Sequence, residues 1–252
     1  MLDMKNSFLQ LLVGLSVLLL AAVLLKQQII TTIFWYKVAG EVQDTAAIAI
    51  TPQEAVRTLH SDTDASYEQY SFYDLTVPLI FSSGRIKEDS STVLAMVDTS
   101  TTKAYSLWRG AKLAHEFQID QRRTNTEVHI VCGTRMTQTF HCDDNYLFLS
   151  NTLLVTTEDA GLFSSQETKI RTAMYLLMKH EYVDAETSRI VSLELNDTFI
   201  GYLLYAGSTA TALIFEKNNH QQPFQFVFSN MTTEEIETVL ANTNYTPRST
   251  AE

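Results

Sequence analysis

Two places in the chain carry residues whose types and spacing could support chemistry, and the first is His180-Glu181-x-x-Asp184. This is the spacing of the helical zinc motif, with an aspartate in place of the second histidine. On a helix, His180 and Asp184 would lie on one face, as two ligands of one metal ion require. However, His180 also suits the negative end of a helix dipole, and the sequence offers no third ligand. His180 and Asp184 are therefore the candidate site residues, but no metal centre is predicted.

The second place is Ser100-Thr101-Thr102-Lys103, which has the Ser-x-x-Lys spacing of acyl-transfer enzymes. Those enzymes need the serine and the lysine on one helical turn, whereas this segment lies in a polar loop between two predicted strands. We therefore do not expect Lys103 to reach Ser100. The sequence also contains no Gly-x-Ser-x-Gly, Walker or dinucleotide-binding motif. No catalytic residue and no cofactor is predicted, which favours a protein without enzymatic activity.

Cys132 and Cys142 are the two cysteines of the chain. A hairpin predicted over residues 127–142 would bring them close enough for a disulfide. An exported domain would favour that disulfide, whereas a cytosolic one would keep both as buried thiols, and the sequence leaves this choice open. His129 and His141 would complete a zinc set, but strand alternation places residues three apart, or adjacent ones, on opposite faces.

An apolar run at Phe8–Leu25 contains two clearly polar residues, Gln10 and Ser16. As a helix it would reach roughly 27 Å, close to the hydrocarbon thickness of a bilayer. A cleaved signal peptide usually has a shorter apolar core followed by small residues at the cleavage site, and this run lacks both features. We therefore predict that residues 1–37 form an uncleaved membrane anchor with an interfacial extension, which contacts membrane lipid.

Phe34, Trp35 and Tyr36 follow this run and are typical of an aromatic belt at the membrane–water boundary. The alternative is that they pack on the folded domain, because aromatic side chains are also ordinary core residues. Lysine counts on the two flanks favour a cytoplasmic domain, but a large domain after an N-terminal apolar segment is most simply exported. The sequence thus predicts a single-pass membrane protein with an extracytoplasmic soluble domain.

The rest of the chain alternates predicted helices and strands. Capping residues mark three helix starts, one in the segment Thr51–His60 and the others at Ser164–Glu167 and Thr232–Glu235. Strand-like segments lie between them, including Tyr146–Thr156. The last four, within residues 190–228, are predicted to form an antiparallel meander.

The uncharged segment Phe199–Phe215 is predicted to be two buried strands, because Gly207 and Ser208 interrupt it. The predicted fold class is α+β, with an N-terminal transmembrane helix followed by a mainly antiparallel sheet with three to four helices. The soluble domain is placed at residues 43–242 and a flexible tail at 243–252.

The chain closes with the strand-like segment Gln222–Ser229, a short cap at Asn230–Thr232, and an amphipathic helix. This order of elements resembles the end of PsbP-like domains. The resemblance covers about the last quarter of the chain and is one of element types, without a shared sequence motif. It implies an α+β domain with a mainly antiparallel sheet, and it assigns no functional residue.

The chain is acidic, with a formal net charge of −11. Such a charge repels phosphate backbones at long range, so nucleic-acid binding is not expected. The run Asp143-Asp144-Asn145 could offer oxygen ligands to calcium, but we interpret it as a polar turn after the hairpin.

Three functions are consistent with these patterns. The leading one is a membrane-anchored, extracytoplasmic and non-enzymatic domain that acts through protein contacts in an envelope assembly or transport system. The second is an anchored hydrolase or metal-dependent enzyme whose residues come from distant segments. The third is a module that binds a small ligand or a lipid on an apolar sheet face.

Overall fold

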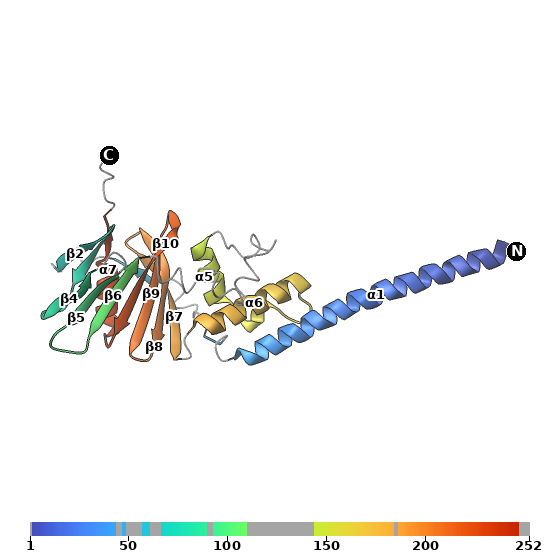
Figure 1. Ribbon diagram of the computed structural model, residues 1–252, viewed down its shortest axis with the longest axis horizontal. Coiled ribbons are helices and arrows are strands. Elements are labelled where there is room, and N and C mark those ends of the chain that lie inside the picture. The colour runs from blue at the N-terminus through green and yellow to red at the C-terminus, as the bar shows by residue number, and fades with distance from the viewer. Residues whose placement is uncertain are drawn as a thin grey trace.

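The computed structural model describes residues 2–43, 47–48, 57–60, 67–89, 93–109, 144–183 and 186–246. Figure 1 shows a sheet-rich body, two helices beside it, and a long helix, α1 (Leu2–Glu41), that projects away from both. The two helices are α5 (Asn145–Leu154) and α6 (Gln166–Tyr182), and a single 3-10 turn, η3 (Thr157–Asp159), lies between them. The described chain has an α+β fold.

The body is built on an eight-stranded sheet with the order β1-β7-β8-β9-β10-β6-β5-β4. Its strands are β1 (Arg57–Leu59), β4 (Gly84–Asp89), β5 (Val93–Asp98), β6 (Ala104–Arg109), β7 (Thr187–Leu195), β8 (Phe199–Ala206), β9 (Thr209–Glu216) and β10 (Asn219–Ser229). A second, three-stranded sheet has the order β11-β3-β2, with β2 (Glu68–Phe72), β3 (Leu75–Leu79) and β11 (Asn244–Tyr245).

The large sheet is mixed: its strand pairs are mainly antiparallel, as predicted, but one pair is parallel. β1 runs parallel to β7, with Arg57 opposite Leu193 and Leu59 opposite Leu195. The helix predicted to reach His60 therefore does not include Arg57–Leu59. At the open edge of β7, backbone pairing gives these residues hydrogen bonds that outweigh their local preference for helix.

Local capping explains where the helices of the body begin. The Ser165 side chain accepts a hydrogen bond from the Thr168 N–H at the start of α6. α7 (Thr233–Ala241) begins with a reciprocal capping box between Thr232 and Glu235. Both predicted helix starts are confirmed. The two-strand interpretation of Phe199–Phe215 is also confirmed, since β8 and β9 meet at Gly207, whose φ of 56° favours glycine.

α5 occupies a segment that was predicted to be strand, and that prediction is wrong. Asp144 caps the helix by accepting from the Leu147 N–H at 2.9 Å. The buried residues are Phe148, Leu149, Thr152 and Leu153. Their spacing of one and four residues places them on one face of a helix. The packing of this face stabilises the helix, although the segment also contains residues that favour strands.

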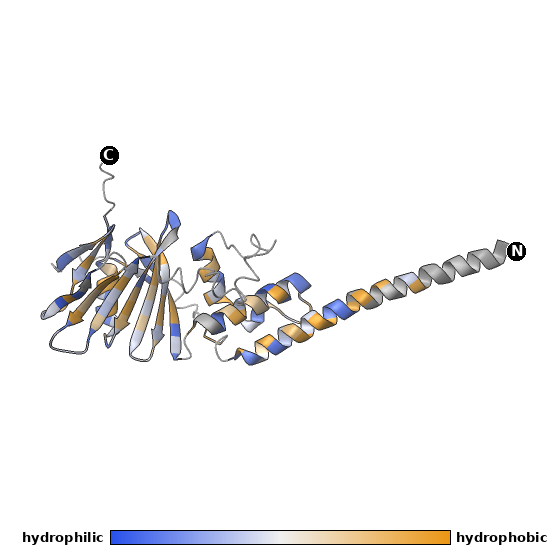
Figure 2. Cartoon of the chain, viewed as in Figure 1, coloured by the Kyte–Doolittle hydropathy of each residue, from blue (hydrophilic) through white to orange (hydrophobic). Residues whose placement is uncertain are grey.

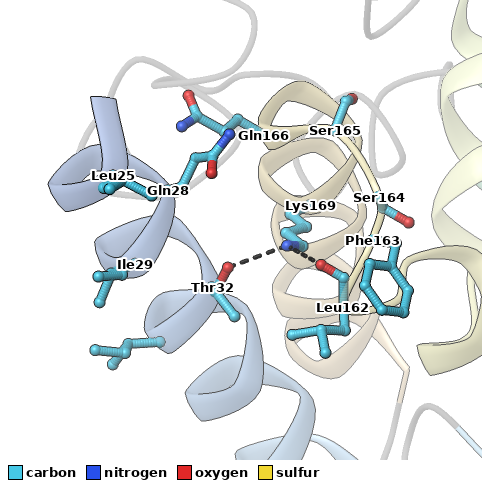
Figure 3. Close-up of a pocket in the computed structure, with 11 residues that line it drawn as sticks. Leu25, Gln28, Ile29, Thr32, Leu162, Phe163, Ser164, Ser165, Gln166 and Lys169 are labelled. Atoms are coloured by element: carbon cyan, nitrogen blue, oxygen red, sulfur yellow. Dashed lines mark hydrogen bonds between the residues drawn. The ribbon is translucent and has the colours of Figure 1, made fainter. Parts of the chain in front are cut away.

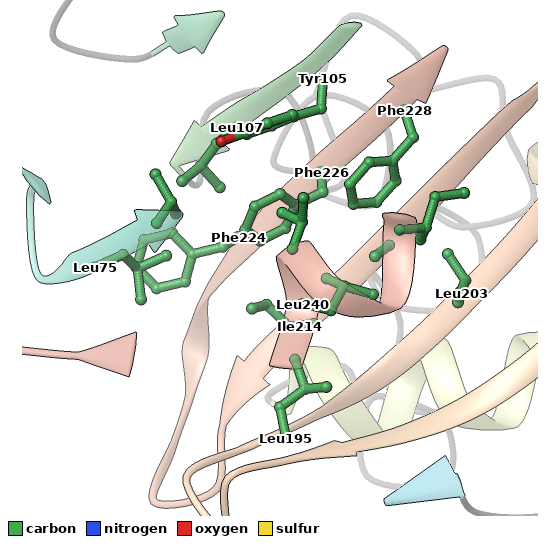
Figure 4. Packing of buried hydrophobic residues seen from close by; sticks show 14 of the residues in the cluster. Leu75, Tyr105, Leu107, Leu195, Leu203, Ile214, Phe224, Phe226, Phe228 and Leu240 are labelled. Atoms are coloured by element: carbon green, nitrogen blue, oxygen red, sulfur yellow. The ribbon is translucent and has the colours of Figure 1, made fainter. Parts of the chain in front are cut away.

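One face of the large sheet carries the main hydrophobic core, which α7 and the three-stranded sheet cover (Figure 4). Phe226 and Phe228 of β10 stack with ring centroids 5.8 Å apart, and neither side chain is exposed. Leu240 of α7 and Leu75 of β3 belong to the same cluster. The buried Tyr105 hydroxyl donates to the Pro78 carbonyl at 2.6 Å, which ties β6 to β3.

The opposite face of the sheet is covered by α5. Leu149 and Leu153 of α5 form a buried cluster with Tyr202 of β8 and with Leu213 and Phe215 of β9. Because both faces are covered, β8 and β9 are apolar along most of their length. A third cluster continues outwards from α5 through α6 to α1, so that the helices form a layered extension of the core.

The prediction of a membrane-spanning N-terminal helix is wrong: over the residues that the structure describes, no helix is long and apolar enough to cross a membrane. α1 instead continues without a break through Lys26, Gln27 and Gln28 to Glu41. The buried residues in its last turns are spaced three or four positions apart, as in a helix that packs through one face, and they do not form an unbroken apolar run. The single-pass membrane location depended on the predicted span and is corrected with it.

Trp35 shows how α1 uses its aromatic residues. Its side chain is 3 % exposed and lies in one cluster with Val38, Val42 and buried residues of α6. The alternative in which this segment packs on the folded domain therefore describes Trp35, while Phe34 and Tyr36 are exposed. The membrane belt proposed for the three aromatics loses its basis together with the span.

The close pairing of β8 and β9 gives the first testable prediction. A Cβ atom on Gly201 would lie 1.9 Å from the Leu213 carbonyl oxygen. Replacing Gly201 by alanine must therefore spread the two strands, and we expect the free energy of unfolding to fall by about 3 kcal/mol. Urea unfolding followed by circular dichroism measures this change.

Gly161→Ala is the matched control, because nothing lies within 4 Å of the Cβ position at Gly161. Its unfolding free energy should stay within about 0.5 kcal/mol of the native value. Equal stability of the two variants would show that β8 and β9 have room for a methyl group.

Candidate functional site

The residues singled out by the sequence do not assemble into a reactive site within the described chain. His180 lies exposed in the last turn of α6, and Asp184 lies outside the described residues. Cys132 and Cys142 also lie outside them, so the disulfide stays a prediction. No group of three or more His, Cys, Asp or Glu residues in the described ranges could hold a metal ion.

Ser100 and Lys103 have separate partners. The Ser100 hydroxyl donates to Asp98 Oδ1 at 2.8 Å in the turn between β5 and β6. Lys103 Nζ instead pairs with Glu235 Oε1 of α7 at 2.6 Å. The hairpin context predicted that Ser100 and Lys103 would be separated. Their contacts with Asp98 and Glu235 are structural, and the two residues do not have the geometry of an acyl-transfer site.

An Asp–His pair that the sequence analysis missed joins α5 to the β9–β10 hairpin. His220 Nδ1 lies 2.9 Å from Asp144 Oδ2, and the Tyr146 ring lies against the imidazole with centroids 5.1 Å apart. Deeper in this cluster, the Ser150 and Tyr202 hydroxyls are 2.5 Å apart. The residues come from segments 76 positions apart, so no local motif could have revealed them.

The contacts around Asp144 and His220 are those of a structural cluster that holds elements of the fold together. His220 Nε2 is buried and has no hydrogen-bond partner among the described residues. A catalytic dyad would need a nucleophile at that nitrogen, and the described hydroxyls of Ser150 and Tyr202 bond to each other instead. Asp144 meanwhile holds the N-terminus of α5 through the Leu147 N–H.

Two buried lysines of α6 hold the segment that connects α5 to α6. Lys179 Nζ donates to the Val155 carbonyl at 3.0 Å, and Lys169 Nζ donates to the Leu162 carbonyl at 2.7 Å. The Lys179 side chain is completely buried, and this burial lowers its pKa to about 8, although the Asp159 carboxylate opposes the change.

A groove lies between α1 and the start of α6 (Figure 3), and we call it the α1–α6 groove. It has a volume of about 540 Å³ and is open rather than enclosed. Its lining is Leu25, Gln28, Ile29, Thr32, Ile33, Leu162, Phe163, Ser164, Ser165, Gln166 and Lys169. Of these eleven described residues, Lys169 alone carries a charge.

Exposed apolar residues extend along α1 beside the groove, and Figure 2 shows hydrophobic residues recurring along the coloured part of this helix. Leu25, Ile29, Ile33 and Tyr36 recur at steps of four and three residues, so they form one line along the helix, which we call the outer stripe. Each of them is more than half exposed. Phe163, on the other wall of the groove, is 97 % exposed.

Comparison with protein-family models finds no match, and comparisons with curated proteins and with solved structures find none either. The resemblance of the C-terminal segment to PsbP-like domains therefore stays a prediction.

The Asp144–His220 contact predicts an acid-sensitive part of the stability. Burial raises the pKa of Asp144, but hydrogen bonds from His220 and from the Leu147 and Tyr146 N–H groups outweigh it, so the pKa lies below its usual value. A lowered pKa in the fold stabilises the protein above the unfolded pKa, about 3.9, and this contribution is lost as the pH falls through the folded value.

Asp144→Ala should reduce the unfolding free energy by about 1–2 kcal/mol at neutral pH, because it removes the helix cap and the histidine partner. Asp144→Asn keeps a capping oxygen and should lose less, while its stability should fall less steeply below about pH 4. Urea unfolding at several pH values measures both effects. Equal losses in the two variants would show that the charge, and not the cap, carries the contact.

Lys179 predicts a second pH-dependent part of the stability, on the alkaline side, where folding disfavours the charged form of the side chain. Because its pKa is lower in the fold than in the unfolded chain, the unfolded state binds more protons between about pH 8 and pH 10. The free energy of unfolding should therefore rise with pH in this window, by at most about 3 kcal/mol. Lys179→Met should remove that rise, and the difference between the two urea titrations isolates it from tyrosine ionisation. Parallel titrations would show that the Lys179 ammonium is not penalised by burial.

Proposed function

We propose that this protein is a binding domain that docks a helical segment of a partner protein in the α1–α6 groove and along the outer stripe of α1. In this proposal the domain acts through protein contact and not through catalysis. The observation that carries it is the exposed line of large apolar side chains that borders the groove.

The amount of exposed apolar surface supports this proposal. Among the residues of α1 whose side chains the structure describes, nine large apolar ones are more than a third exposed, and they are Leu15, Leu20, Val23, Leu25, Ile29, Ile30, Ile33, Phe34 and Tyr36. Four of them form the outer stripe, and exposed apolar surface that is continuous in this way marks interaction sites. Full burial of one such side chain contributes about 1.5–3 kcal/mol, so a partner that covered the outer stripe would gain a substantial binding free energy.

The shape of the groove favours a chain segment over a small molecule. Small-ligand pockets usually enclose most of the ligand, whereas this groove is open and continues along α1. Its line of apolar residues at helical spacing matches the helix-in-groove mode of recognition, in which anchors recur every three or four residues. The polar groups of its lining do not form an acid–base pair, so the enzymatic alternative gains no support here.

Photo-crosslinking in the native host tests this proposal. A photoreactive amino acid at Ile33 of the full chain should give one defined protein adduct. The same amino acid at Ile86, an exposed apolar residue of β4 far from the groove, should give none. Mass spectrometry of the adduct identifies the partner and the crosslinked segment.

The purified partner then allows a quantitative prediction. Ile29→Ser and Ile33→Ser should each weaken its binding about tenfold, because each removes roughly 1.4 kcal/mol of apolar burial. Ile86→Ser should leave the dissociation constant unchanged. An adduct spectrum that is the same at positions 33 and 86, or affinities that do not respond to the stripe substitutions, would refute the docking function.

A further inference from the structure

Lys169 is the most unusual residue of the α1–α6 groove. Its side chain is 5 % exposed, and its ammonium donates to Thr32 Oγ1 at 3.0 Å and to the Leu162 carbonyl at 2.7 Å (Figure 3). Both acceptors are neutral. No ion pair between the described residues includes Lys169.

Other lysines of the body lie near a carboxylate, and this includes the buried Lys179, on which the Asp159 carboxylate acts. Lys103 and Lys217 are each about 30 % exposed, and both pair with a carboxylate, of Glu235 and Glu194 respectively. Lysine is rarely buried as deeply as Lys169 without an acidic partner, because an ammonium that leaves water needs compensating charge. Lys169 is thus a buried ammonium that has no carboxylate partner within the described ranges of the chain.

The groove-lining groups at the start of α6 add positive potential near Lys169, while Glu167 of the same turn is not among the lining residues. Among the described residues, no carboxylate lines the groove. Ser165 and Gln166, which do line it, are the N-cap and the first residue of α6, where the helix dipole places partial positive charge. The protein as a whole has a net charge of −11, so this groove differs in sign from the average surface.

We infer that the segment bound by the α1–α6 groove is an amphipathic helix whose apolar face includes one aspartate or glutamate, and that this carboxylate pairs with Lys169. This inference rests on the proposed docking function and specifies the chemistry of the partner. Apolar side chains of the helix cover the outer stripe and Phe163, while the carboxylate reaches the ammonium at the base of the groove. The shared burial of both charges strengthens their attraction and excludes helices without an acidic residue at that position.

A peptide selection on the full chain tests the inference. The library contains amphipathic helical peptides of about 16 residues, roughly 24 Å long, with randomised positions between fixed apolar anchors. Selection on the native protein should enrich Asp or Glu at one position between the anchors. Selection on Lys169→Met should give no such enrichment, whereas Lys169→Arg, which keeps the positive charge, should retain it.

A double-mutant cycle makes the pairing quantitative. For the best selected peptide, replacing its Glu by Gln should weaken binding to the native protein at least about tenfold, as for a desolvated charge pair. The same replacement should change binding to Lys169→Met less than about threefold, because the partner charge is already absent. Fluorescence anisotropy with labelled peptides measures the four dissociation constants.

Two controls separate pairing from the structural contacts of Lys169. Thr32→Val removes one hydrogen-bond acceptor but keeps the ammonium, so it should preserve the acidic preference. Lys37→Met removes one positive charge from α1 outside the groove lining and should also preserve it. Near-ultraviolet circular dichroism of each variant checks that α1 still packs through Trp35.

The outcomes distinguish the inference from the function on which it rests. Peptides that bind through the groove without an acidic preference, or a Glu→Gln effect that is the same in Lys169→Met, would overturn the inference and leave docking intact. Failure to select any peptide whose binding weakens in Ile29→Ser would overturn the docking function itself.

Discussion

The burial of β8 and β9 on both faces is the constraint on which the rest of the molecule depends. Residues of β9 that point one way pack beneath α7, and their neighbours Leu213 and Phe215 pack beneath α5. α5 in turn supports α6, and α6 supports the last turns of α1. The position of the α1–α6 groove therefore follows from a sheet whose two faces are both covered.

The helical layers are joined by lysines used as hydrogen-bond donors. Lys169 and Lys179 bind carbonyls of Leu162 and Val155, which lie in the connection between α5 and α6. This connection carries Phe163, the most exposed large apolar residue of the described chain. By fixing its backbone on α6, the two lysines hold an apolar wall opposite α1, and the α1–α6 groove exists because that wall stays in place. Lys169 thus makes structural hydrogen bonds and also carries a charge that has no ion-pair partner among the described residues. Because the side chain has both roles, a test of its pairing has to keep the two roles apart.

The parts of the fold that could be predicted from the sequence are those with local physical causes. Thr232 and Glu235 cap α7 through neighbouring atoms, and Gly207 permits the turn between β8 and β9, so each signal is complete within a few residues. The secondary structure was predicted wrongly where packing against segments far apart in the chain determines it. Asn145–Leu154 became a helix because of the surfaces it covers, and Arg57–Leu59 became a strand because β7 offers an open edge. The apolar N-terminal segment was interpreted from its length, its composition and its flanking residues, whereas the end of α1 is defined by the packing of Trp35 against α6. Neither the groove nor the Asp144–His220 contact has a local signature, since both join segments far apart in the chain.

The composition of the groove also bears on selectivity. An apolar stripe alone would accept many amphipathic helices, because hydrophobic burial depends on area and little on direction. A charge at the base changes this, since a helix that presents an apolar residue there leaves the Lys169 ammonium buried further without compensation. The penalty falls on incorrect partners, while the gain for the correct one depends on how closely its carboxylate matches the ammonium. Affinity would then come mainly from the outer stripe and discrimination mainly from Lys169, which assigns separate physical roles to two adjoining parts of one surface.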